Sequence, residues 1–222
     1  MTAEHRERRM PSKPVFRGVI HTHAFFASIP GALYLLYRSP EGQALWPIVV
    51  YGISLMLLFG ISALYHRFDW SPKLDERIGT LDRVMIYVFI AANFTPFAVY
   101  AMQGTLATVL LAIIWGSIGV GLLVNLFWLD GPRWLHSSLY VGVSAAIGFA
   151  VPQLLENLGP WAVFWIALGG FIHILGAAIY ASRYPNPLPR RFGFHEVFHC
   201  FVTVAVAMHY TVVAVYLLPV SA

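Results

Sequence analysis

The chain has 222 residues, of which 59% are apolar, 15% aromatic and only 11% charged. Soluble domains carry about 25% charged residues, so this composition predicts an integral membrane protein and excludes an ordinary soluble enzyme. The formal net charge of +4 does not indicate a nucleic-acid partner, because the basic residues lie in short segments between apolar runs of spanning length. The single cysteine, Cys200, excludes an internal disulfide.

The apolar runs predict seven transmembrane helices, because about 20 residues of helix cross the hydrocarbon core. A backbone in lipid must satisfy its own hydrogen bonds, which makes spans of this length helical. The predicted fold class is an all-α membrane protein with one domain, residues 1–222, that begins with a short basic tail over residues 1–17. The expected spans are Val19–Tyr37, Trp46–Tyr65, Val84–Met102, Thr105–Trp128, Trp134–Leu155, Pro160–Tyr180 and Phe194–Leu218.

The distribution of the 14 Lys and Arg residues predicts the orientation of these spans. Four segments on one side of the predicted membrane carry five, four, one and three of them, and the other side carries only Arg38. Positive charge is retained on the cytoplasmic side, so we expect a cytoplasmic amino terminus and an extracytoplasmic carboxyl terminus in the cell (plasma or inner) membrane. The first seventeen residues are polar and basic, and no cleavable signal peptide is visible in them.

Three histidines are expected at one membrane depth on the cytoplasmic side. His195 and His199 are four residues apart at the start of the seventh span, which places both on one helical face with β-carbons about 5–6 Å apart. His66 ends the second span on the same side. Three imidazoles with an open fourth position are typical of a catalytic zinc site. We therefore predict one metal ion shared by these three residues.

Two further polar residues lie at the same predicted depth. Ser62 precedes His66 by one helical turn, and Asp82 is expected to open the third span. Taken alone, Ser62 fits a serine that bonds to a backbone carbonyl one turn back, and Asp82 fits a helix-start carboxylate favoured by the helix dipole.

The remaining histidines are interpreted more plainly. A lone histidine near the end of a span is usually an interfacial or hydrogen-bonding residue, and this interpretation is given to His21, His23, His136, His173 and His209. The last of them is ten residues beyond His199, about 15 Å of helical rise, which is too far to share an ion with it.

The segment from His195 to His199 also matches H-E-x-x-H, in which Glu196 would be the general base of a metalloprotease. Leu129-Asp130-Gly131 resembles the downstream ligand motif of site-two-type intramembrane proteases. In that family, however, the histidine motif precedes the aspartate motif, whereas no acidic residue follows Glu196 here. The order of the motifs therefore disfavours a protease.

Together, three motifs resemble the haemolysin III branch of the progestin and adipoQ receptor family, over nearly the whole chain. They match its S-x-x-x-H, following D and H-x-x-x-H signatures in order. Span one departs from the Glu-x-x-Asn pattern of many relatives, since it reads Arg17-Gly-Val-Ile-His-Thr-His23. The motifs are Leu58-Phe-Gly-Ile-Ser-Ala-Leu-Tyr-His66, Leu81-Asp-Arg83 leading into Ile90-Ala-Ala-Asn-Phe-Thr-Pro-Phe97, and Gly193-Phe-His-Glu-Val-Phe-His199.

The resemblance implies seven transmembrane helices, a cytoplasmic amino terminus, and a zinc ion held by His66, His195 and His199. It also implies that Asp82 contacts the zinc-bound water and that Ser62 lies beside the site. Relatedness to adiponectin receptors and alkaline ceramidases implies hydrolysis of a lipid amide at the cytoplasmic leaflet. In that hypothesis zinc supplies hydroxide and polarises the carbonyl, Asp82 accepts the water proton, and Ser62 donates to the oxyanion.

A second hypothesis is a non-enzymatic, receptor-like sensor or regulator of membrane state, in which a structural zinc fixes the ends of spans two, three and seven. A cytolysin, which the family name suggests, is disfavoured because nearly uncharged spans lack the polar lining of an aqueous pore. In either favoured case the expected partner is a membrane lipid, as substrate or ligand.

Overall fold

The structure is a computed structural model that describes residues 13–42, 44–127 and 133–220. Every long element in this part of the chain is an α-helix, and the described residues contain no strand. The elements are α2 (Val19–Arg38), α3 (Trp46–Arg67), α4 (Pro72–Tyr100), α5 (Gly104–Phe127), α6 (Arg133–Ala145), the 3-10 helix η1 (Ala146–Ala150), α7 (Val151–Ser182), α8 (Phe194–Val212), the π-helix η2 (Val213–Leu217) and α9 (Leu218–Val220).

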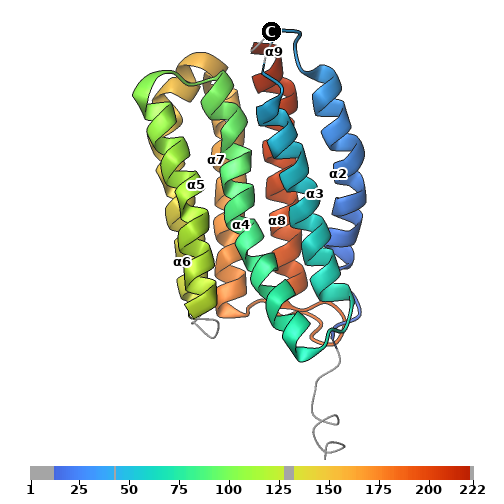
Figure 1. The fold of residues 1–222 in the computed structure, drawn as a ribbon. Coiled ribbons are helices and arrows are strands. Elements are labelled where there is room, and N and C mark those ends of the chain that lie inside the picture. The colour runs from blue at the N-terminus through green and yellow to red at the C-terminus, as the bar shows by residue number, and fades with distance from the viewer. Residues whose placement is uncertain (1–12, 43, 128–132, 221–222) are drawn as a thin grey trace, which may run out of the picture.

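The helices form a bundle whose axes run roughly parallel (Figure 1). Within the described residues, six continuous helical stretches are long and apolar enough to cross a membrane. The first two match the predicted spans to within two residues at each end. The count differs from the predicted seven because the fifth stretch, Trp134–Ser182, is one run of 49 residues where two spans were expected.

That long stretch contains a sharp break. Gly159 has φ 80° and ψ 171°, a non-helical conformation in the left-handed half of φ that glycine adopts without steric cost, and Pro160 follows it. A straight helix of 49 residues would measure about 74 Å, more than twice the hydrocarbon thickness of about 30 Å. Instead the chain rises through α6, η1 and the start of α7, and it descends through the rest of α7 after Gly159; α6 and α7 pack against each other (Figure 1). The break lies between the predicted span boundaries Leu155 and Pro160.

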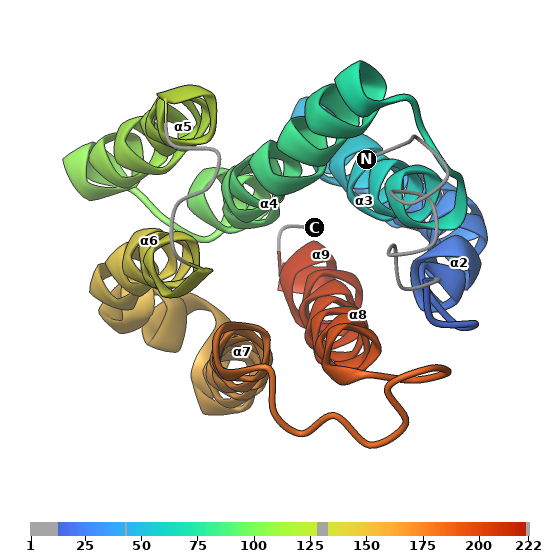
Figure 2. The same ribbon diagram turned by 90° about the horizontal axis from the view of Figure 1, so that it is seen from below.

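Small residues let neighbouring helices approach closely, as in other membrane bundles. A Cβ on Gly52 of α3 would lie 2.9 Å from the Ala32 Cβ of α2. A Cβ on Gly121 of α5 would lie 2.3 Å from the Tyr87 ring of α4. Viewed along the axes, α2 and α3 lie beside one end of the α4 ribbon, α5 and α6 beside the other, and α8 between α2 and α7 (Figure 2).

The ends of α2, α3, α4 and α8 that carry the predicted site lie at the same end of the bundle, which we call the histidine end (Figure 1). The segment before α2 is tied to this end by backbone bonds from Val15 and Phe16 to Arg190 and Arg191, at 3.3 and 3.1 Å. Lys13 adds a 3.0 Å ion pair with Asp69. Residues 1–12 of the predicted tail lie outside the described residues, as do 128–132, which include the Leu129-Asp130-Gly131 motif.

One predicted boundary at the histidine end is wrong. Asp82 does not open a helix, because α4 begins at Pro72, ten residues earlier. Proline and Asp75 in the first turn are ordinary helix-start residues. The first turns of α4 are polar, so they are not part of the apolar run that predicted the span. The helix dipole acts only within the first turn, so it does not account for the position of Asp82.

Candidate metal centre

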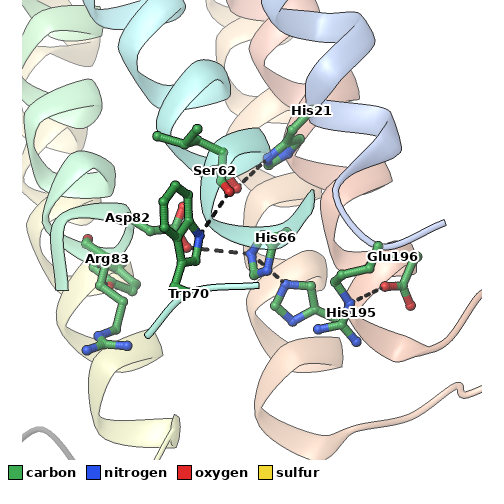
Figure 3. A network of polar contacts seen from close by, with 11 residues as sticks. His21, Ser62, His66, Trp70, Asp82, Arg83, His195 and Glu196 are labelled. Carbon is green, nitrogen blue, oxygen red and sulfur yellow. Dashed lines mark hydrogen bonds and ion pairs between the residues drawn. The ribbon is translucent and has the colours of Figure 1, made fainter. Parts of the chain in front are cut away.

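The three histidines predicted to share an ion lie together at the histidine end. His66 is in the last turn of α3, whereas His195 and His199 are in the first two turns of α8. One ligand nitrogen from each lies within 4.8 Å of the others. The Nε2 atoms of His66 and His195 are 3.1 Å apart although the two residues are 129 positions apart in sequence (Figure 3).

This geometry fits a bound metal. His66 and His199 are 7% and 3% exposed and His195 is partly buried, so three aromatic nitrogens converge where water is scarce. Tetrahedral zinc with bonds of about 2.0–2.1 Å separates its ligand nitrogens by about 3.3 Å, close to the observed spacing of His66 and His195. The sequence-based grouping of the three residues is confirmed, and the donor set is compatible with a metal ion.

Asp82 reaches the same place from α4. Its Oδ2 lies 3.6 Å from the His66 Nε2, and its side chain is 20% exposed. Ser62, which is 4% exposed, donates a hydrogen bond to the Asp82 carboxylate (Figure 3). The plain interpretation of Ser62 as a serine bonded to a backbone carbonyl is wrong, because its partners are the side chains of Asp82 and His21.

His21 belongs to the site, although its position in the sequence predicted only an interfacial or hydrogen-bonding histidine. The α2 residue is 3% exposed, its Nδ1 lies 2.8 Å from the Ser62 Oγ, and its ring stacks on that of His199 with centroids 3.8 Å apart and planes at 6°. The interpretation of His21 as a hydrogen-bonding residue holds, but its partners were not foreseen. The available signal was its depth, because it lies near the start of its span on the side where the other three gather. His23 is exposed.

The Glu196 carboxylate binds Arg17 and the backbone of Gly193. Its Oε1 is 2.5 Å from the Arg17 Nε, and its Oε2 accepts a 2.7 Å hydrogen bond from the backbone N–H of Gly193, which caps α8. The side chain is 1% exposed. Both carboxylate oxygens therefore join the start of α8 to the segment before α2, an arrangement that disfavours Glu196 as the general base of an H-E-x-x-H protease.

A second buried polar group lies deeper in the bundle. His209 of α8 lies 3.1 Å through Nδ1 from the amide nitrogen of Asn93 in α4, and 3.1 Å through Nε2 from the carbonyl of Ile166 in α7. A carbonyl can only accept, so Nε2 carries the proton and Nδ1 accepts from Asn93. His173 lies beside it, with ring centroids 5.6 Å apart. As predicted, His209 is not among the three converging histidines.

The fold and the site define a multi-pass helical membrane protein with a three-histidine centre at one end of its bundle. The chain belongs to the haemolysin-III related family, whose model matches residues 10–210. The predicted resemblance is thus confirmed.

Relatives of several kinds cover most of this chain. It is 29% identical to hemolysin-3 of Bacillus cereus over 212 residues, 93% of each chain. It is 26% identical to the human monocyte to macrophage differentiation factor, over 89% of this chain and 82% of that one. The adiponectin receptor protein of Drosophila melanogaster is also 26% identical, over 89% of this chain and 51% of the receptor.

Proposed function

We propose that this protein is a zinc-dependent hydrolase of lipid amides that acts at the cytoplasmic leaflet of the cell membrane. The observation that carries the proposal is the position of Asp82, a carboxylate 3.6 Å from one of three converging histidines. A purely structural ion needs four protein ligands and no carboxylate held beside it, whereas a catalytic ion keeps an open position with a proton acceptor nearby.

In this proposal His66, His195 and His199 hold the zinc. When bound, the ion would supply Lewis-acid polarisation of the amide carbonyl and an acidified water. Asp82 accepts the proton of the attacking water. The Ser62 proton, which Asp82 attracts while it is ionised, becomes free once Asp82 is protonated, and Ser62 then donates to the developing oxyanion. Asp82 and Ser62 thus act one after the other.

The proposed membrane topology supports a lipid substrate. We propose that Trp134–Ser182 crosses the membrane twice, because it doubles back at Gly159, which makes seven spans in all. The sequence-based topology assigns 13 of the 14 Lys and Arg residues to the membrane side of the three histidines, so in this proposal the histidine end faces the cytoplasm and the carboxyl terminus lies outside. A substrate with one end in the hydrocarbon and an amide near the headgroups would reach the site directly from the leaflet.

The test combines metal content with activity. Detergent-purified wild type should contain about one zinc per chain by mass spectrometry, and His66→Ala and His199→Ala should lose it. His23→Ala is the matched control, because that histidine is exposed on the helix that carries His21. Asp82→Asn should keep the zinc and lose hydrolysis of a fluorescent N-acyl amide. Well-folded wild type without metal, or Asp82→Asn with full activity, would refute the proposal.

A second candidate function is a receptor-like sensor or regulator of membrane state with a structural zinc. It is favoured by the way the site joins α3 to α8, because closing a long loop of chain is itself stabilising. In that case His66→Ala should lower the free energy of unfolding, while the wild type should hydrolyse no amide in the presence of its zinc.

A further inference from the structure

The start of α2 lies against the candidate metal centre. Gly18 caps this helix with φ 76°, and a Cβ at that position would lie 2.9 Å from the His66 Cβ. No residue other than glycine fits there without strain, so α2 begins in direct contact with the end of α3. One turn further on, this contact brings His21 into the bundle instead of leaving it at the lipid surface.

His21 makes two different contacts with the site. Its Nδ1 is 2.8 Å from the Ser62 Oγ, and its ring lies parallel to that of His199 at 3.8 Å between centroids. Phe59 closes the far side, with its ring edge-on at 5.2 Å. The first contact is polar and directional (Figure 3), and the second is a stack that holds the plane of a candidate ligand ring.

An ionised Asp82 sets one direction for the polar contact. The Asp82 carboxylate has no proton to give, so the Ser62 hydroxyl donates its single proton to it. In this arrangement the Ser62 oxygen accepts from His21, which carries its proton on Nδ1. The order is therefore His21 N–H to Ser62 O–H to Asp82, a chain in which each bond orients the next group.

We infer that His21 is a positioning residue with two separable effects. Through Ser62 it fixes the proton acceptor Asp82, and through its ring it fixes His199. The first effect rests on the proposed function, whereas the second requires only that the site binds metal. His21 itself is not placed as a ligand, because the nitrogens that converge are those of His66, His195 and His199.

Two substitutions separate the effects. His21→Phe keeps an aromatic ring against His199 and removes the hydrogen bond. His21→Asn places an amide N–H near the position of Nδ1 and removes the stacked ring. Ser28→Ala is the control for changes to α2, because the Ser28 hydroxyl is nearly buried and bonds only to the Phe25 carbonyl of its own helix.

We expect the two variants to fail in opposite ways. His21→Phe should bind zinc nearly as tightly as the wild type in competition with a chelator, while kcat for a fluorescent N-acyl amide falls about tenfold or more. His21→Asn should recover most of that turnover but bind zinc about 10–100-fold more weakly, the usual effect of losing a group that orients a ligand. Equal losses of both properties in both variants would reduce His21 to packing and overturn the inference.

A readout without substrate keeps this test separate from that of the proposed function. In protein labelled with ¹⁵N-histidine, magnetic resonance should find His21 protonated at Nδ1, and Ser62→Ala should alter that signal. Protonation at Nε2 in the wild type would overturn the inference. If the wild type hydrolyses no amide, the proposed function fails, and the nitrogen spectra and zinc affinities still decide the role of His21.

Discussion

The ion pair between Arg17 and Glu196 predicts a measurable loss of stability when its charge is removed. Glu196 is 1% exposed and Arg17 22% exposed. Removing one partner of a fully buried pair costs about 3–5 kcal/mol, and partial access of Arg17 to water reduces this, so we expect Glu196→Gln to lose about 2 kcal/mol of unfolding free energy. Glu196→Ala also leaves the Gly193 N–H without its acceptor, which brings the expected loss to about 4 kcal/mol.

Equilibrium unfolding in detergent micelles, followed by circular dichroism, measures both losses. Glu156→Gln is the matched control, because Glu156 is exposed and its charge can be removed without leaving a buried cation. Arg17→Met combined with Glu196→Gln should recover about 1 kcal/mol over Glu196→Gln alone, since no unpaired charge then remains. If Glu196→Gln unfolds with the same free energy as the wild type, the argument from burial is wrong.

The same variant separates two kinds of chemistry. Because both oxygens of Glu196 are turned toward Arg17 and Gly193, Glu196→Gln should keep its zinc and its amide hydrolysis under conditions where it remains folded. Loss of hydrolysis with zinc retained would make Glu196 a general base, as in an H-E-x-x-H protease, and would contradict the roles proposed for Asp82 and Ser62.

Three further predictions concern other parts of the bundle. Gly18→Ala places a side chain at φ 76° against the α3 histidine, so it should cost about 1–2 kcal/mol from backbone strain alone and weaken zinc binding in chelator competition. Asn93→Leu leaves the His209 Nδ1 without a donor and should lower the free energy of unfolding by about 1–3 kcal/mol. Its zinc content should not change, because His209 lies about 15 Å along α8 from the three converging histidines. In a Cys200→Ala background, Glu156→Cys lies near the break at Gly159 within α7 and should react with a membrane-impermeant thiol reagent added to intact cells. A cysteine in the loop between α7 and α8 should not react, and the reverse labelling would refute the proposed double crossing.

The convergence of the three histidines could be predicted from sequence because its signals are local. His195 and His199 share a helical face by spacing alone, and the charge pattern placed His66 at the same depth. His21 could not be predicted in the same way, because its contacts to α3 and α8 depend on how closely α2 approaches, which Gly18 permits. That distance is a property of packing, and no periodicity within one helix encodes it.

The helices of the fold, too, could be predicted only where they have a local signal in the sequence. Apolar runs located the helices and the break between residues 155 and 160, whereas the polar first turns of α4 could not be found this way because they bury little apolar surface. The buried pair of His209 and Asn93 could be predicted only in part. The sequence indicated a hydrogen-bonding histidine at His209, but its partner Asn93 is 116 residues away and comes into contact with it only in the folded bundle.

The order in which the ligands occur along the chain has a consequence for how the protein is made. His66 and His195 meet across 129 residues, and two of the three histidines belong to α8, the last long helix to be synthesised. A chain still in production offers an ion only a single histidine of the three. In the proposed metal site, stable loading therefore has to follow insertion of the final long helix, so a loaded molecule would be one whose assembly in the membrane is complete.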